Sequence, residues 1–319
     1  MMQPLLMRLR QRHPDAEIHV LAPAWSAPLL QRMPEVAAVI ENPFLHGAFN
    51  WAGRKALGSR LAGVDFSSAY VLPNSWKSAL APYFAAIPER VGYTGEARFG
   101  LLNRRLPKST LPRLVDRYTA LAGNFPDPTP VPRLTSSPEQ QAAARQALGL
   151  APDIPAIIFC PGAEYGPAKR WPAHHFAAVA QKVDVPRGFP SVTGGTAVWI
   201  LGSAKDAAVG DEIVHLSGNK ARNLCGQTQL GQAIDLIASA HAVVTNDSGL
   251  MHVAAALDRP LVALYGSSSP GYTPPLSARA KIVTLHLECS PCFKRTCPLG
   301  HLRCLEDITP ERVLAELAL

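Results

Sequence analysis

The sequence predicts an α/β protein built from two parallel-sheet domains. Short apolar strand-like runs alternate with helical patterns almost from end to end. The chain has 319 residues, enough for two domains of ordinary size. A proline-dense segment, Phe125–Pro132, divides this alternation in two, because prolines cannot continue a helix or a central strand.

The first predicted domain covers residues 1–132 and includes the proline-dense linker. It opens with an amphipathic helical pattern at Met1–Arg12. Further helices are predicted at Trp25–Met33, Trp51–Ala62, Lys77–Ala86 and Leu111–Ala122, and strands at Glu17–Pro23, Ala37–Asn42 and Ser67–Pro73. Strands separated by helices favour a parallel sheet covered on both faces.

The second predicted domain covers residues 133–319 and repeats the alternation. Its first helix has Ser137 as N-cap, Pro138 in the first turn and Gly149 near its end. Strands are predicted at Ala156–Cys160, Ala197–Gly202, Ala242–Asn246, Leu261–Tyr265 and Lys281–His286. Helices are predicted at His174–Val183, Lys205–Leu216, Leu230–Ala240, Leu250–Leu257 and Thr309–Leu319. Two such domains would place a ligand cleft outside the carboxyl ends of the strands.

Composition excludes several classes of protein. Hydrophobic residues make up 47% of the chain and charged residues 17%, which is typical of globular domains and not of disorder. The longest apolar runs are strand-sized and too short to span a bilayer. The N-terminus lacks the apolar core of a secretory signal. We therefore expect a soluble, cytoplasmic protein.

The positive charge lies in the first half of the chain. Residues 1–148 hold 17 Lys and Arg against 10 Asp and Glu, whereas residues 149–319 hold 14 of each kind. Solvated arginine-rich helices would explain this, and so would an anionic partner such as a phosphorylated glycolipid or the inner membrane surface. Nucleic acid is disfavoured, because the arginines are dispersed and no nucleic-acid-binding motif accompanies them.

Several familiar catalytic and cofactor motifs are absent from the sequence. It contains no G-x-G-x-x-G dinucleotide fingerprint, no G-x-x-x-x-G-K-[ST] phosphate loop and no G-x-S-x-G nucleophile elbow. It also lacks an Asp-x-Asp metal clamp. We therefore predict no cofactor and no catalytic metal.

The strongest local signal is a predicted strand that runs directly into Asp247, Ser248 and Gly249, where a helix begins. Ser248 or Asp247 can cap this helix, and Gly249 lets another group approach the backbone. The free N–H groups and the helix dipole would then form an anion site at the carboxyl edge of the sheet. An ordinary helix start is the alternative interpretation.

The second signal is the loop Pro161–Pro172, which leaves a predicted strand and ends in Lys169, Arg170, Trp171 and Pro172. A loop that carries one ammonium group into a cleft would suit the neutralisation of a diphosphate. A solvated loop lysine is the alternative interpretation of Lys169.

These segments resemble glycosyltransferase family 9. The similarity lies in Asn246–His252, the Pro161–Pro172 loop and Gly226–Leu230, in Gln3–Leu9, Val71–Ala79 and Arg90–Tyr93, and in Cys289–His301. It covers essentially the whole chain. The resemblance implies a GT-B architecture, with two Rossmann-like domains, ADP-heptose held by the second and the acceptor by the first.

The resemblance also implies an inverting, metal-independent transfer of heptose onto the inner core of lipid A-bearing lipopolysaccharide, at the inner membrane surface. It assigns Lys169 to the leaving diphosphate. It assigns the remaining substrate contacts to Asp247, Ser248, Gly249 and His252 for the donor, and to Thr228 and Asp206 for the adenosine. Since aspartate repels phosphate, we expect Asp247 to bind sugar hydroxyls or orient the helix start. A packed helix histidine is the alternative for His252.

One feature departs from the family pattern. The family opens with a β-strand and a Gly-Asp turn ahead of the helix that here begins near Met2, and that aspartate is the expected general base for the acceptor. We expect the strand and the base to lie upstream of Met1, since a central strand is needed to pair its neighbours. The alternative is a product that folds poorly and is inactive.

Four of the six cysteines are clustered as Cys289-x2-Cys292-x4-Cys297-x6-Cys304. This spacing is compatible with zinc or an iron–sulfur cluster, with disulfides, or with reduced thiols packed in a loop. Cys160 and Cys225 lie beside predicted strands and are expected in the core.

Two other functions are compatible with the sequence. A nucleotide-sugar epimerase shares the two-domain plan but needs no lipid acceptor and no basic first half. A nucleotide-sugar-binding module without a catalytic base is the non-enzymatic alternative. Product analysis with ADP-heptose and a heptose-terminated acceptor would distinguish all three.

Overall fold

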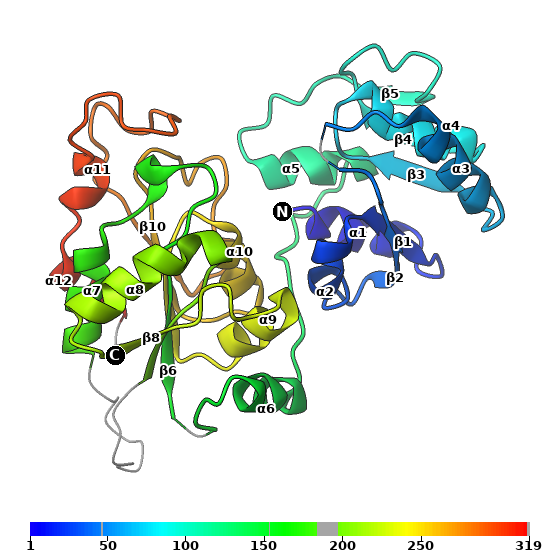
Figure 1. The fold of residues 1–319 in the computed structure, drawn as a ribbon. Coiled ribbons are helices and arrows are strands. Elements are labelled where there is room, and N and C mark those ends of the chain that lie inside the picture. The colour runs from blue at the N-terminus through cyan, green and yellow to red at the C-terminus, as the bar shows by residue number, and fades with distance from the viewer. Residues whose placement is uncertain (46, 153, 184–196, 318–319) are drawn as a thin grey trace. The chain divides into compact units, whose positions relative to one another are not determined.

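A computed structural model describes residues 1–45, 47–152, 154–183 and 197–317 (Figure 1). The chain divides into two compact units, the first formed by residues 1–27 and 35–130 and the second by residues 28–34 and 131 onward. Both units contain parallel strands and flanking helices, which confirms the predicted α/β class. No helix in the described part of the chain is long and apolar enough to cross a membrane.

The second unit contains a six-stranded parallel sheet with the order β11–β10–β9–β6–β7–β8. Its strands are β6 Ala156–Cys160, β7 Ala197–Ile200, β8 Ala221–Asn223, β9 Ala242–Asn246, β10 Leu261–Leu264 and β11 Ala280–Val283. The chain starts at the central strand β6, adds strands on one side, and returns to β9 on the other side of β6. The sheet is therefore doubly wound, and its switch point lies between β6 and β9.

Helices cover both faces of this sheet. One face packs against α6 Pro138–Ala147, α9 Leu230–Ala238 and α10 Gly249–Ala256, and the other against α7 Ala173–Lys182, α8 Ala207–Leu216, α11 Arg303–Glu306 and α12 Pro310–Leu317. In β6, Ile158 enters the first layer while Ile157 and Phe159 enter the second, and all three are fully buried. Burial on both faces explains the uninterrupted apolar runs. The predicted last helix ended at Leu319, and its last two residues lie outside the described ranges.

The first unit contains two smaller parallel sheets, β1–β2 and β3–β4–β5. The strands are β1 Ile18–Ala22, β2 Val36–Glu41, β3 Ser68–Val71, β4 Glu89–Tyr93 and β5 Arg104–Leu106. The helices are α1 Gln3–Arg12, α3 Trp51–Ala62, α4 Leu80–Phe84 and α5 Leu114–Thr119. The short helix α2 Ala27–Leu30 crosses the boundary, since all its residues after Ala27 belong to the second unit. One apolar cluster joins α1 to both β1 and β4, so the two sheets share a core.

The first half differs in detail from the sequence-based prediction. Its strands form two sheets among the described residues, and α2 is much shorter than the helix predicted there. β4 was not predicted, because charged residues and Gly92 interrupt its apolar pattern. A Cβ on Gly92 would lie 2.9 Å from Leu102 Cδ1 and 3.0 Å from the carbonyl oxygen of Val71, so close packing excludes a side chain there. The strand expected upstream of Met1 stays a prediction.

Candidate active site

The helix start predicted as an anion site lies at the switch point of the second sheet. β9 ends at Asn246, and the Ser248 hydroxyl caps α10 by accepting a hydrogen bond from the Met251 N–H at 3.5 Å. Gly249 is exposed, and a Cβ there would meet nothing within 4 Å. Free N–H groups of the first helical turn therefore border open space, as an anion site requires.

Lys169 reaches this helix start from the neighbouring strand. The loop after β6 ends in a 3₁₀ turn at Pro167–Lys169, and Lys169 Nζ lies 2.5 Å from Asp247 Oδ2. The Asp247 side chain is only 5% exposed, and that of Lys169 is 18% exposed. The ion pair therefore neutralises a nearly buried carboxylate, and Lys169 is not a solvated loop lysine.

Asn246 fastens both ends of the loop that carries Lys169. Its Nδ2 donates to the Pro161 carbonyl at 2.6 Å, and its Oδ1 accepts from the Trp171 N–H at 3.1 Å. Trp171 is itself buried, and its indole N–H donates to the Ile308 carbonyl at 2.9 Å. Asn246 was predicted to end a strand and to begin the motif Asn246–His252, but its two hydrogen bonds were not predicted. An asparagine that ends an apolar strand was the available signal, because a buried amide needs polar partners.

His252 lies one turn into α10, four residues after Ser248, so the two side chains share one side of the helix. Burial lowers the pKa of His252 to about 4, and the charge of Lys169 lowers this pKa further while that of Asp247 raises it. The imidazole is therefore neutral near pH 7 and offers one hydrogen-bond donor and one acceptor.

We expect His252 to make the protein sensitive to acid. The unfolded chain binds a proton near pH 6.5 and the folded chain only near pH 4, so stability falls as the pH drops through this interval. Between pH 7 and pH 4, the free energy of unfolding should fall by about 2–3 kcal/mol more in the unaltered protein than in the His252→Gln variant. Thermal unfolding across this pH range measures the difference. His215→Gln, at an exposed position of α8, should behave like the unaltered protein.

Asp206 and Thr228 lie among the segments that follow β7 and β8. The Asp206 Oδ2 accepts hydrogen bonds from the Ser203 N–H at 3.0 Å and from its hydroxyl at 2.8 Å, and Oδ1 lies 3.5 Å from Arg170 Nη2. This carboxylate therefore caps a turn and touches the loop of Lys169. Thr228 is half-buried in the segment before α9. Their contacts with adenosine stay predictions.

Ser267 and Ser268 were missed by the sequence analysis. They follow β10, at the same edge of the sheet, with exposed fractions of 1% and 6%. Among the described residues, neither hydroxyl oxygen has a hydrogen-bond partner. Three consecutive serines shortly after an apolar strand were the available signal, since buried hydroxyls are normally paired.

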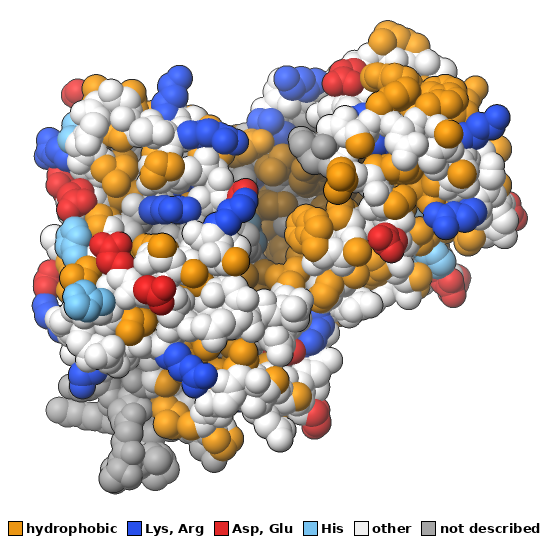
Figure 2. All heavy atoms as spheres, viewed as in Figure 1, with side chains coloured by type: hydrophobic (Ala, Val, Ile, Leu, Met, Phe, Trp, Pro, Cys, Tyr) orange, Lys and Arg blue, Asp and Glu red, His pale blue; other side chains and the backbone are white. Residues whose placement is uncertain are grey.

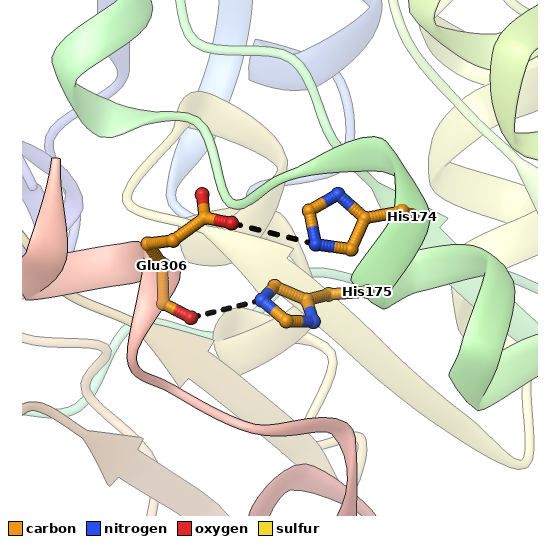
Figure 3. Close-up of side chains that lie close together, drawn as sticks. All are labelled: His174, His175 and Glu306. Atoms are coloured by element: carbon orange, nitrogen blue, oxygen red, sulfur yellow. Dashed lines mark hydrogen bonds and ion pairs between the residues drawn. The ribbon is translucent and has the colours of Figure 1, made fainter. Parts of the chain in front are cut away.

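A histidine–glutamate cluster ties α7 to α11 (Figure 3). His174 Nε2 lies 3.4 Å from Glu306 Oε1, and His175 Nε2 lies 2.9 Å from the Glu306 carbonyl oxygen. In the described ranges, these three residues form the group whose possible metal-ligating atoms lie within 4.8 Å of one another. Because His175 already bonds to the backbone and His174 is exposed, we interpret the cluster as a link between the two helices.

The six cysteines are free thiols, so the disulfide interpretation is not supported. Cys160 and Cys225 are buried, as expected for core residues, and burial raises the pKa of both thiols.

Two parallel-sheet units, one of them doubly wound with charged groups at its switch point, form the architecture of GT-B glycosyltransferases. The model of glycosyltransferase family 9 (heptosyltransferase) matches residues 54–303. The chain belongs to this family, and it is a glycosyltransferase, which leaves the epimerase alternative without support.

Several known proteins are similar to this chain over nearly its full length. The chain is 47% identical to lipopolysaccharide heptosyltransferase 2 of Escherichia coli, covering 99% of this chain and 93% of that protein. It is 46% identical to lipooligosaccharide heptosyltransferase 2 of Haemophilus influenzae, with 99% and 94% covered. The solved structure of E. coli ADP-heptose lipopolysaccharide heptosyltransferase II superposes with a TM-score of 0.85 at 45% identity, covering 99% of this chain and 92% of that chain. These similarities confirm the family resemblance and the predicted fold class.

Proposed function

We propose that this glycosyltransferase moves L-glycero-D-manno-heptose from ADP-heptose to the first heptose of the lipopolysaccharide inner core, with inversion and without a catalytic metal. The observation that carries the proposal is the Lys169–Asp247 pair at the start of α10, in a chain 47% identical to a lipopolysaccharide heptosyltransferase. In this proposal the second domain, residues 133–319, holds the donor. The first, residues 1–132, binds the acceptor.

When the donor binds, its diphosphate would replace Asp247 as the ionic partner of the Lys169 ammonium group. The free N–H groups of α10 and the Ser248 hydroxyl would donate to the same phosphates, and Gly249 would give them access to the backbone. These groups would stabilise the charge that develops on departing ADP. Asp247, once released, is suited to accept hydrogen bonds from sugar hydroxyls. His252 would contact the sugar as a neutral imidazole.

The remaining roles follow the family resemblance. Thr228 and Asp206 would contact the adenosine. The acceptor hydroxyl needs a general base, expected in a Gly-Asp turn ahead of α1, and we assign this role to no residue of the chain. The alternative to transfer is binding of the nucleotide sugar alone.

The test is incubation with ADP-heptose and a heptose-terminated lipopolysaccharide core. We expect a product heavier by one heptose, whose new anomeric configuration, read by NMR, is opposite to that of the donor. Added Mg²⁺ or Mn²⁺ should not raise the rate. Calorimetric binding of ADP-heptose without any product would instead support the binding-only alternative. Transfer to cores that lack the first heptose would indicate another member of the same family.

We further propose that the first domain meets the anionic membrane surface that holds the acceptor. Phe49, Trp51, Trp76 and Tyr83 form an aromatic patch in the first unit. The ring centroid of Phe49 lies 6.1 Å from that of Trp51 and 5.2 Å from that of Trp76, and Phe84 contacts both Trp51 and Tyr83. All four side chains are at least 36% exposed. Figure 2 shows basic side chains scattered among hydrophobic ones on this unit. Aromatic rings beside basic groups suit a lipid headgroup region.

Acceptor affinity should therefore depend on salt more strongly than donor affinity does. Raising the ionic strength screens the attraction between the basic first half and an anionic glycolipid. The affinity for ADP-heptose should fall less, because this ligand is held by close contacts. The measurement compares the KM for each substrate at about 50 mM NaCl with its value at about 500 mM NaCl. The Debye length at the higher salt is about one-third of that at the lower salt. Equal salt sensitivity for both substrates would contradict the proposal.

A further inference from the structure

The loop of Lys169 rests on a second loop, residues 289–304, which we call the cysteine loop. The Tyr165 hydroxyl donates to the Phe293 carbonyl at 2.7 Å, and the Ala168 N–H donates to the Arg295 carbonyl at 3.0 Å. Gly166 has φ +149°, and a Cβ there would lie 2.5 Å from the Arg295 carbonyl oxygen. The position of Lys169 therefore depends on how firmly the cysteine loop is held.

The cysteine loop encloses a small cavity of about 20 Å³. Its lining includes four thiol side chains, which we call the cysteine cluster: Cys289, Cys292, Cys297 and Cys304. Ser267 also lines this cavity, and its buried hydroxyl is one of the groups that have no hydrogen-bond partner among the described residues. A buried hydroxyl without a partner at the wall of a cavity is a group that a ligand would satisfy.

We propose that the four thiols of the cysteine cluster bind one zinc ion. Thiolate sulfur is the ligand that structural zinc prefers, four such ligands complete its coordination, and Cys289-x2-Cys292 has the spacing of zinc-finger pairs. The sulfurs line one cavity but are more widely spaced than the ligand atoms of His174, His175 and Glu306. Binding would draw them together and release the thiol protons to solvent.

Such an ion would be structural. It would tie the first part of the cysteine loop to Cys304, at the end of that loop in α11, and so hold in place the loop that carries Lys169. The proposal does not depend on the identity of the donor sugar or of the acceptor.

The test is the metal content of the full chain, purified without a metal-affinity step and measured by inductively coupled plasma mass spectrometry. We expect one zinc per chain in the unaltered protein, and at least a tenfold loss in Cys292→Ser and Cys297→Ser. Cys225→Ala removes a thiol outside the cluster, and His174→Ala removes the exposed imidazole beside Glu306. Both of these variants should keep their zinc.

A second measurement covers variants that fail to fold. Unaltered protein produced with cobalt in place of zinc should show the visible absorption of tetrahedral cobalt bound to thiolates, and a mercurial thiol reagent should abolish it. Absence of stoichiometric metal, iron in place of zinc, a cobalt spectrum without thiolate bands, or zinc lost in His174→Ala but kept in Cys297→Ser would each overturn the proposal.

Discussion

Replacing Lys169 by alanine is expected to lower kcat/KM for ADP-heptose about 30- to 1,000-fold, or roughly 2–4 kcal/mol of transition-state stabilisation. Lys169 is the cation that the structure places at the start of α10, 2.5 Å from Asp247. No Asp-x-Asp clamp is available to share the charge of the leaving diphosphate. Steady-state kinetics with donor and acceptor varied separately would measure the loss.

Two variants make this result specific. Lys205→Ala removes a lysine that is exposed and paired with Glu164 at 3.0 Å, and it should leave kcat/KM nearly unchanged. Lys169→Arg keeps the positive charge and should retain more activity than the alanine variant. Full activity in a folded Lys169→Ala protein would remove this residue from the site.

Replacing Asn246 by alanine should destabilise the second unit by about 2–5 kcal/mol. The substitution leaves the Pro161 carbonyl and the Trp171 N–H without a partner in a buried place, at about 1–3 kcal/mol for each group. Because the loop between these two positions carries Lys169, kcat should fall as well. Thermal unfolding and initial rates, measured on the same preparation, test both effects.

Asn103 provides the matched control. It also bridges two backbone groups, accepting from the Arg90 N–H at 2.8 Å and donating to the Pro88 carbonyl at 2.5 Å, but it is exposed. Since water can replace its bonds, Asn103→Ala should cost less than about 1 kcal/mol. Equal losses for both asparagines would show that burial of the Asn246 bonds is unimportant.

Central strands were predictable because their neighbours on both faces require apolar side chains. Ala156–Cys160 and Ala242–Asn246 have the predicted bounds in the structure. The strand β4 and the three-residue strand β8 were not predicted, because their sequences carry charges. They become strands by pairing with neighbours such as β3 and β7. Local pattern thus predicts apolar strands well and charge-bearing strands poorly, whether the strand is central in its sheet, as β4 is, or at the edge, as β8 is.

The candidate site was predictable as separate segments, and the contacts between them were not. Asp247 and Ser248 follow from a strand that runs into a helix start, and Lys169 from a loop that leaves a strand. The ion pair joins residues 78 positions apart, a pairing that only the order of β6 and β9 in the sheet creates. His252, Thr228 and Asp206 rested on the family resemblance, and their ligand contacts remain predictions.

The pairing of Lys169 with Asp247 has a consequence for ligand design. Before a ligand arrives, the two charges cancel at short range, so they exert little attraction on a distant anion. We expect a ligand to be recognised by exchange at contact, with one ionic partner released for each one gained. A compound that offers a carboxylate to the lysine and a cation to the aspartate would replace both halves of the pair, without copying a diphosphate.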